Sequence, residues 1–324
     1  MRRRRTGRRP DHPRPRVNDL VGKVRAGNVR AVARLISLVE SGSDAELREA
    51  AKQLRAPGRA RVVGLTGSPG VGKSTSTAAL VKALRARGER VGVLAVDPSS
   101  PFTGGALLGD RVRMQDHALD DGVFIRSMAT RGHLGGLSWA VPQALRVLDA
   151  AGFDVVLVET VGVGQAEVDV RALADTTIVL LAPGMGDGVQ AAKAGILEIA
   201  DVFVVNKADR DGAQSTVRDL RNMIALGGGS WRPPVVSTVA VREEGIGDLL
   251  KALDDHARHL GETGEGRARR LARARDEITA AALRALRDRF GDPASDLRLY
   301  RLAQDVLDGL ADPYTAADDL IAEL

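Results

Sequence analysis

A glycine-rich segment, GSPGVGKS at 67–74, has the spacing of a phosphate-binding loop: Gly, four residues, Gly, Lys and then Ser or Thr. An apolar run precedes it and an amphipathic segment follows, which is the strand and helix context that such a loop requires. Glycines in the segment allow the backbone N–H groups to turn toward phosphate oxygens, and the N-terminus of the following helix adds positive charge. We expect Lys73 to reach the β- and γ-phosphates of a nucleotide and the Ser74 hydroxyl to ligate Mg2+. The residues predicted to bind the nucleotide here are Gly67, Ser68, Pro69, Gly70, Val71, Gly72, Lys73, Ser74 and Thr75.

A second motif, Asn206-Lys207-Ala208-Asp209, stands at the end of a later apolar run and predicts how the base is recognised. The Asp209 carboxylate can accept two hydrogen bonds from guanine, one from N1–H and one from the exocyclic amine. Adenine has no donor in that position and would leave a desolvated carboxylate without a partner. We expect Asn206 to brace the loop and the Lys207 stem to lie over the base. The two motifs together favour GTP and GDP as the bound nucleotides.

Acidic residues at the ends of the intervening apolar runs are candidates for a magnesium site beside the phosphates. Glu159 closes the run FDVVLVE and begins a Glu-x-x-Gly segment, so we expect the Gly162 N–H to contact the γ-phosphate and to move when it leaves. Asp97 ends the run VGVLAVD, and Asp110 lies in the glycine-rich stretch after it, which is typical of a switch segment. The predicted metal neighbourhood is Ser74, Asp97, Asp110 and Glu159, and the predicted catalytic residues are Lys73, Asp97, Glu159 and Gly162.

Hydrolysis has no obvious water-positioning residue in this sequence. Small GTPases keep a Gln directly after the glycine of the Glu-x-x-Gly position, whereas here Gln165 lies three residues beyond Gly162. We therefore predict slow intrinsic turnover, which a partner accelerates by ordering a switch or supplying a cation. Arg111, Arg113 and Arg131 are candidate cations, but a surface or structural role is the simpler interpretation of each.

Several longer stretches resemble the MeaB family, also called ArgK, within the SIMIBI class of P-loop proteins. They are DPSSPFTGGALLGDRVRM (97–114), ATRGHLGGLS (129–138), ETVGVGQAEVDV (159–170), PGMGDGVQAAKAGILEIAD (183–201) and DPYTAADDL (312–320). The resemblance implies a GTPase chaperone of cobalamin-dependent methylmalonyl-CoA mutase, which gates cobalamin delivery and protects the mutase from inactivation. It also implies a homodimer formed through a C-terminal helical arm, and an adenosyltransferase is a further candidate partner.

The resemblance adds a third switch around Gly186 and Asp187. After this pair the family commonly has an acidic and then an aliphatic residue, whereas this chain has glycine and then valine. The loop that contacts guanine O6 often reads Ser-Ala in this class, and here Val239 and Ala240 occupy the place. Because a backbone N–H makes that contact, we expect Ala240 to serve.

Three other functions compete with this interpretation. Nickel-insertion GTPases of the same class hold metal through Cys and His, but this chain has no Cys, and the pair His256 and His259 lacks an obvious third ligand. We interpret that pair as part of a solvated helix face. A kinase-type ATPase of the lysine/arginine/ornithine transport system would need ATP as phosphoryl donor, which conflicts with Asp209. A nucleic-acid-binding GTPase rests on the arginine-rich N-terminal tail alone.

The elements that must position these motifs form an α/β pattern. From Arg61 to about Leu260, apolar runs alternate with amphipathic segments, which is typical of a mostly parallel sheet covered by helices on both faces. We predict strands at 62–66, 91–96, 123–126, 154–159, 177–182, 202–206 and 235–238. The predicted organisation is a disordered tail (1–16), an N-terminal helical extension (17–58), a P-loop GTPase domain (59–261) and a C-terminal helical dimerisation arm (262–324). In the arm, an apolar stripe requires a partner surface on the same domain or on a second subunit; it consists of Leu271, Ile278, Leu283, Leu286 and Phe290.

Composition excludes several other classes. With 44% hydrophobic and 27% charged residues among 324, the chain is ordinary for a globular protein, and the absence of cysteine rules out disulfides and thiolate metal sites. No apolar run approaches the roughly 20 residues of a membrane-spanning helix, so we expect a soluble protein without a membrane partner. The absence of cysteine fits a reducing cytosol, and we expect a cytoplasmic location. Residues 1–16 hold eight Arg against one Asp, which leaves −2 on the rest of a chain whose net charge is +5. We interpret this tail as a solvated leader, although contact with nucleic acid or anionic lipid stays open. The absence of serine and of an amphipathic pattern argues against a transit peptide.

Overall fold

The fold comes from a computed structural model, which describes residues 17–41, 44–54, 58–98, 120–130, 140–160, 166–184, 198–290 and 296–322. By their contacts the residues form two compact units, Met1–Arg270 and Leu271–Leu324. None of the helices in the described ranges is long and apolar enough to cross a bilayer.

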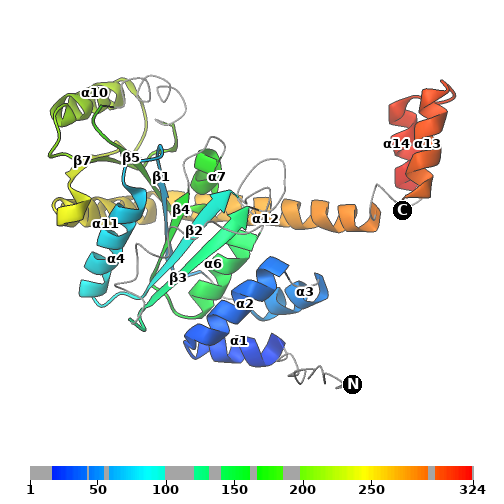
Figure 1. Cartoon of the computed structure of the whole chain (residues 1–324), viewed down its shortest axis with the longest axis horizontal. Helices are drawn as coiled ribbons and strands as arrows, with labels where there is room; N and C mark the ends of the chain where they lie inside the picture. The colour runs from blue at the N-terminus through cyan, green and yellow to red at the C-terminus, as the bar shows by residue number, and fades with distance from the viewer. Residues whose placement is uncertain are drawn as a thin grey trace, which may run out of the picture. The chain divides into compact units, whose positions relative to one another are not determined.

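The first unit is built on a parallel sheet, which has seven strands within the described ranges. The strands are β1 (Arg61–Thr66), β2 (Val91–Pro98), β3 (Val123–Thr130), β4 (Val155–Thr160), β5 (Thr176–Leu181), β6 (Val202–Asn206) and β7 (Val235–Thr238). Their order across the sheet is β3-β2-β4-β1-β5-β6-β7 (Figure 1). Each strand begins within a residue of the apolar run that predicted it, because strands of a parallel sheet are buried on both faces. β3 continues past Arg126 to Thr130, since its whole length pairs with β2. The predicted α/β class is confirmed.

Helices cover both faces of this sheet (Figure 1). They are α1 (Val17–Arg25), α2 (Val29–Ser41), α3 (Asp44–Gln53), α4 (Lys73–Ala86), α6 (Ala140–Ala150), α7 (Ala166–Leu173), α10 (Ala213–Leu226) and α11 (Ile246–Thr263), with the 3-10 turn η2 (Ala240–Arg242). α12 (Glu265–Phe290) begins in this unit. On one face, α4 and α11 pack on side chains such as Val63 and Leu65 of β1. On the other face, α6, α7 and the N-terminal helices pack on side chains such as Val62 of β1 and Val158 of β4.

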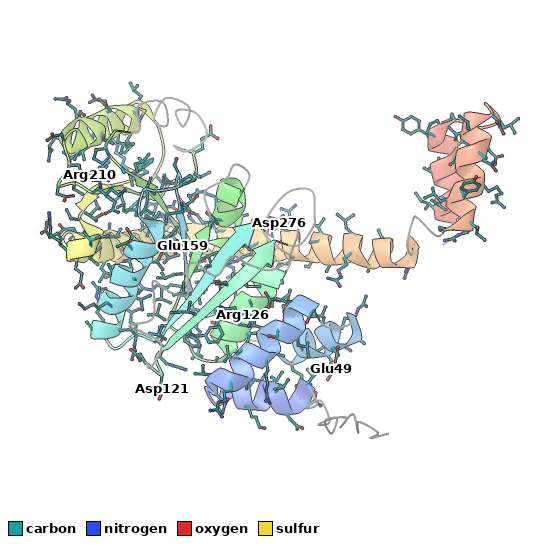
Figure 2. All side chains as sticks on the ribbon, in the orientation of Figure 1. Glu49, Asp121, Arg126, Glu159, Arg210 and Asp276 are labelled. Carbon is teal, nitrogen blue, oxygen red and sulfur yellow. The ribbon has the colours of Figure 1, made fainter. Side chains whose placement is uncertain are left out.

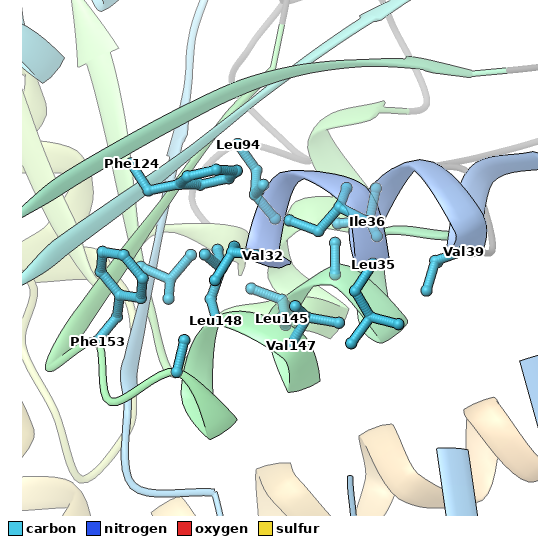
Figure 3. Close-up of a cluster of buried hydrophobic side chains, with 14 of the residues drawn as sticks. Val32, Leu35, Ile36, Val39, Leu94, Phe124, Leu145, Val147, Leu148 and Phe153 are labelled. Atoms are coloured by element: carbon cyan, nitrogen blue, oxygen red, sulfur yellow. The ribbon is translucent and has the colours of Figure 1, made fainter. Parts of the chain in front are cut away.

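The N-terminal helices share a hydrophobic core with the sheet. Val32, Leu35 and Ile36 recur at helical spacing on α2, are fully buried, and belong to the same cluster as Leu145 and Leu148 of α6 (Figure 3). Burying each such aliphatic side chain contributes about 1.5–3 kcal/mol. The apolar stripe of α2 therefore attaches the N-terminal helices to the domain that carries the phosphate loop.

The second unit consists of the later turns of α12 and two further helices, α13 (Leu297–Leu307) and α14 (Pro313–Ala322). The Asp296 side chain caps α13 by accepting from the Arg298 N–H at 2.9 Å, and the hydrogen bond from the Arg298 side chain lowers the pKa of this carboxyl to about 2. Asp312 caps α14 by accepting from the Tyr314 N–H at 2.9 Å. Apolar side chains of this unit that are more than half exposed are Leu271, Ile278, Leu283, Leu297, Tyr300, Leu307, Leu310, Tyr314 and Ile321.

Candidate nucleotide-binding site

The phosphate loop, residues 67–74, lies at the carboxyl end of β1, the central strand of the sheet. β4 and β5 flank β1, so the carboxyl ends of three strands meet here. Gly67 (φ 144°) and Gly72 (φ 96°) have positive φ angles. A Cβ atom on Gly67 would overlap the Leu180 carbonyl oxygen, and one on Gly72 would overlap the Asn206 amide nitrogen. Glycine is therefore needed at both positions for the loop to approach the neighbouring strands.

Lys73 begins α4 and is held inside the phosphate loop. The residue is only 8% exposed, and its Nζ donates to the carbonyl oxygens of Gly67 at 2.7 Å and Ser68 at 3.1 Å. The N-terminal N–H groups of α4 point to the same loop, because Lys73 is the first residue of that helix. A positive side chain and a helix N-terminus together favour the binding of an anion such as a phosphate.

Glu159, labelled in Figure 2, lies near the carboxyl end of β4 and contacts the first turn of α4. Its Oε1 accepts from Ser74 Oγ at 2.7 Å, and its Oε2 accepts from Thr77 Oγ1 at 2.8 Å. All three residues are at least 92% buried. The structure thus brings the predicted metal ligands Ser74 and Glu159 together. Thr77 was not predicted, although its spacing of three residues from Ser74 puts both hydroxyls on one helix face and was a usable signal.

The oxygen atoms at this contact fit Mg2+. Hydroxyl and carboxylate oxygens are hard ligands, and Mg2+ commonly takes one or two carboxylates together with phosphate oxygens and water. Ser74 Oγ and Glu159 Oε1 are 2.7 Å apart. Adjacent oxygens of an octahedral Mg2+ shell are about 3 Å apart. A small adjustment therefore allows both atoms to share one ion.

Asn206 joins the base motif, residues 206–209, to the phosphate loop. It ends β6 and is 3% exposed. Its Nδ2 donates to the Val71 carbonyl at 2.8 Å, and its Oδ1 accepts from the Ala240 N–H at 3.1 Å and from Thr238 Oγ1 at 3.2 Å. One buried amide therefore holds three segments at the same edge of the sheet. The expected contact of the Ala240 N–H with guanine O6 would require this N–H to be shared with Asn206.

Lys207 and Asp209 lie on the turn after β6. Lys207 has a φ of 56°, a conformation that costs a non-glycine residue about 1–2 kcal/mol, and its Nζ donates to the Gly70 carbonyl at 2.6 Å. Its stem therefore extends from the base motif to the phosphate loop. The Asp209 side chain is 37% exposed, and its Oδ2 lies 3.4 Å from Arg242 Nη1. The carboxylate is accessible to a ligand on the same edge of the sheet as Lys73.

Other predicted functional residues fall outside what the structure describes. Asp97 is on β2, the neighbour of β4, but its side chain lies outside the described part. The residues that lie wholly outside it are Asp110, Gly162, Gly186 and Asp187, and with them Gln165 and the candidate cations Arg111, Arg113 and Arg131. Their predicted roles stay predictions.

The interpretation of His256 and His259 as a solvated helix face is wrong. His256 is fully buried, with Nδ1 2.8 Å from Thr176 Oγ1 and Nε2 3.4 Å from Asp201 Oδ1. The reason is that this face of α11 packs against the first residues of β5 and β6, at the amino ends of the strands, opposite the phosphate loop. Burial lowers the pKa of His256 to about 4, against the opposing effect of the Asp201 charge, so the ring is neutral at pH 7. Within the described residues, no group of three or more His, Cys, Asp or Glu side chains could hold a metal ion.

Asp201 is the charged centre of this second cluster. Its side chain is 3% exposed and accepts hydrogen bonds from the guanidinium groups of Arg269 and Arg171, each at 2.9 Å, and from the Thr177 N–H at 2.8 Å. Burial acts to raise the pKa of Asp201, but the hydrogen bond from Arg269 and the neighbouring positive charges outweigh it and lower the pKa. These contacts join the start of α12 to the amino ends of β5 and β6.

A cavity of about 540 Å3 also opens at the amino ends of the strands. Its walls include the first residues of β4 and β5, Val155 and Thr176, and two leucines of α11, Leu250 and Leu253. It lies at the opposite end of the strands from the phosphate loop, so the chemistry of the nucleotide motifs is not located in it.

The fold and the loop define a class of protein. A parallel sheet whose central strand leads through Gly-x4-Gly-Lys-Ser into a helix, with a strand-end carboxylate against the serine, is that of a P-loop NTPase. The family model described as methylmalonyl Co-A mutase-associated GTPase MeaB matches residues 32–294. The chain therefore belongs to the MeaB family.

Individual relatives cover most of the chain. A protein of Pyrococcus abyssi is 45% identical over 313 residues, which is 95% of this chain and 97% of that protein. GTPase ArgK of Escherichia coli is 36% identical over 274 residues, which is 82% of this chain and 81% of ArgK. The crystal structure of an LAO/AO transport system kinase has a TM-score of 0.68 at 26% identity and covers 94% of this chain and 96% of its own. These likenesses support GTP binding and GTPase activity, and the family description associates its members with methylmalonyl-CoA mutase.

Proposed function

We propose that this protein hydrolyses GTP to GDP and phosphate in a Mg2+-dependent reaction and acts as a chaperone of cobalamin-dependent methylmalonyl-CoA mutase. In this role it gates cofactor delivery to the mutase and protects the mutase from inactivation. The observation that carries the proposal is the joining of two motifs by one buried side chain: Asn206 Nδ2 donates to the Val71 carbonyl at 2.8 Å. This contact supports the proposal that a nucleotide held by the phosphate loop lies beside the carboxylate of Asp209. The association with the mutase is supported by the family description.

Each residue of the site has a distinct task in this proposal. The Lys73 ammonium, now bonded to loop carbonyls, turns to the β- and γ-phosphates and neutralises charge that develops during transfer. Ser74 and Glu159 hold Mg2+, which neutralises charge on the phosphate oxygens when bound. Thr77 donates to Glu159 Oε2 at 2.8 Å and so fixes the orientation of that carboxylate.

We further propose that Asp97 and Asp110 complete the magnesium neighbourhood and that Gly162 senses the γ-phosphate. Gly186 and Asp187 form a third switch in the same proposal. We also propose that intrinsic turnover is slow and that the mutase accelerates it, because no Gln directly follows Gly162 in the sequence. We also propose that the protein acts in the cytoplasm.

The first experiment measures phosphate release from GTP and from ATP by the purified full chain, with and without Mg2+ and with and without the mutase of the same source. We expect slow turnover of GTP only, which rises when the mutase is added. Turnover of GTP that is indifferent to the mutase would remove the assigned client while leaving the GTPase. Equal turnover of ATP would instead support the alternative of a kinase-type ATPase; the structural relative is named a transport system kinase.

Two substitutions test the site itself, each with a matched control. Lys73→Ala should abolish nucleotide binding or turnover, whereas Lys82→Ala, on the exposed face of the same helix, should not. Asp209→Asn should weaken the preference for guanine because the amide presents a donor to the base donors. Asp211→Asn, the same change on an exposed residue two positions away, is its control. If Asp209→Asn binds GTP as tightly as the parent, the assignment of the base motif is wrong.

We also propose a homodimer formed through the C-terminal helical arm, with an adenosyltransferase as a further partner. Leu271 and Ile278 of α12 are 62% and 70% exposed, and such an apolar stripe requires a partner surface. Replacing both by Glu should convert the dimer to a monomer in light scattering after size-exclusion chromatography. A parent protein that is already monomeric would contradict the proposal.

The alternative of a nucleic-acid-binding GTPase rests on residues 1–16, which lie outside the described part of the chain. A chain that lacks residues 2–16 should bind RNA or DNA no more weakly than the full chain if the tail is a solvated leader. A loss of salt-dependent binding on deletion would favour the alternative.

A further inference from the structure

A charged turn follows β7 and lies beside the base motif. Three backbone hydrogen bonds close the turn. The Arg242 N–H donates to the Val239 carbonyl at 2.9 Å, the Glu243 N–H to the Ala240 carbonyl at 3.2 Å, and the Val239 N–H to the Glu244 carbonyl at 3.1 Å. Glu243 has a φ of 60°, which a tight turn of this kind imposes. Arg242 and the two glutamates therefore project from a backbone of defined shape.

The Arg242 guanidinium contacts two carboxylates, those of Glu244 and Asp209. Its Nε donates to Glu244 Oε1 at 2.8 Å and its Nη2 to Glu244 Oε2 at 3.4 Å, which fixes the plane of the group. The remaining Nη1 lies 3.4 Å from Asp209 Oδ2. Glu244 thus holds the guanidinium so that its free edge faces one oxygen of the base-recognising carboxylate.

We propose that Arg242 is a positioning residue for guanine recognition, acting through Asp209. The inference rests on the proposed binding of GTP. A carboxylate has about four lone-pair sites, so one hydrogen bond from Arg242 leaves enough for the two donors of guanine. The terminal torsion of Asp is soft, and a contact at Oδ2 limits its rotation. Arg242 therefore holds both oxygens in the plane in which N1–H and the exocyclic amine can be bound together.

This role has a consequence that separates it from a general electrostatic effect. Hypoxanthine lacks the exocyclic amine of guanine, so ITP can give only one of the two hydrogen bonds to Asp209. Orientation of the carboxylate matters more for two simultaneous bonds than for one. Loss of Arg242 should therefore weaken GTP binding more than ITP binding, whereas loss of a remote positive charge would weaken both equally.

The experiment measures the Kd of the full chain for GTP, ITP and ATP by isothermal titration calorimetry. Arg242→Ala should weaken GTP binding by about two- to fivefold, the range expected for an exposed ion pair, and ITP binding by less than about twofold. Arg242→Lys should give an intermediate result, because Lys keeps the charge but not the planar fork. The control is Lys82→Ala, which removes the 2.5 Å ion pair to Glu243 on the same turn and should leave the ratio of GTP to ITP affinity unchanged.

A double variant tests whether Arg242 acts through Asp209. In an Asp209→Asn background, Arg242→Ala should have no further effect on the ratio of GTP to ITP affinity, because the coupled partner is already lost. An unchanged ratio of GTP to ITP affinity in Arg242→Ala would overturn the inference, whether the affinities for both nucleotides fall equally or not at all. Tighter GTP binding would also overturn it, since Arg242 would then compete with the base. A parent chain with no preference for GTP over ATP would refute the proposed function itself, and this inference with it.

Discussion

The buried His256 gives a quantitative prediction for the stability of the first unit. Its pKa is about 4 in the folded protein, against the ordinary value of 6.5, because burial disfavours the charged ring. The folded-state pKa is lower than the unfolded one, so the unfolded chain takes up the proton first as the pH falls. The stabilisation is fully present above pH 6.5 and is lost as the pH falls from 6.5 through 4.

The size of the effect follows from the two pKa values of His256. The difference between them lowers the free energy of unfolding by about 3 kcal/mol once His256 is protonated in both the folded and the unfolded state. At pH 5 the loss is about 2 kcal/mol. The neighbouring Asp201 does not add to the loss in this window. Its pKa is lowered from 3.8, since the hydrogen bond from Arg269 and the nearby charges outweigh the effect of burial, so it stays ionised down to pH 5.

The test compares urea unfolding of the parent and of His256→Asn at pH 7.5 and pH 5.0. Asn does not titrate, and its oxygen can accept from Thr176 in place of Nδ1, which now lies 2.8 Å from Thr176 Oγ1. The Trp231 ring lies 4.8 Å from the His256 ring and reports unfolding by fluorescence. The chain has two tryptophans, so Trp139→Phe in both proteins leaves Trp231 as the single reporter.

We expect the parent to lose about 2 kcal/mol more than His256→Asn between the two pH values. The Asn variant should be less stable than the parent at pH 7.5, because Asn fills the buried site less well. The difference in free energy of unfolding between the two proteins should be smaller at pH 5.0. If both proteins lost the same free energy of unfolding, the prediction for His256 would be wrong, since other groups would then account for all of the pH dependence.

Three further predictions concern the metal site, the second charged cluster and the N-terminal helices. Glu159→Gln should raise the Mg2+ concentration for half-maximal GTP turnover about 10- to 100-fold in a magnesium titration, and an unchanged requirement would contradict the role of Glu159. Asp201→Asn should lower the free energy of unfolding by about 3 kcal/mol in urea, because Arg269 and Arg171 lose their buried counter-ion; a loss below about 1 kcal/mol would mean that solvent already screens the pair. Leu35→Ala should cost about 2–5 kcal/mol in the same assay, since Leu35 is fully buried between α2 and the rest of the core, and a small loss would show that the N-terminal helices contribute little to folding.

The fold class and the two nucleotide motifs could be recognised from the amino-acid sequence alone. Strands buried on both faces give continuous apolar runs. Such runs marked each of the seven strands in the described part of the chain, because apolar residue types are the ones that are most often buried. The phosphate loop was recognisable because glycine at positions such as Gly72 and the adjoining Lys73 are needed for the backbone geometry and charge of such a loop, whatever surrounds it.

Contacts between side chains on different elements became known from the folded structure. The spacing of Ser74 and Thr77 indicates that they share a helix face, but the contact of Glu159 with both depends on how β4 lies against α4. The sequence suggested a solvated pair at His256 and His259, since a helix that alternates charged and apolar residues does not reveal how wide its buried face is. Packing of α11 on the amino ends of β5 and β6 buried His256 and set its pKa. The approach of Arg242 to Asp209 likewise joins residues 33 positions apart. Local patterns encode elements and motifs, whereas distances between side chains on different elements depend on the packing of the whole unit.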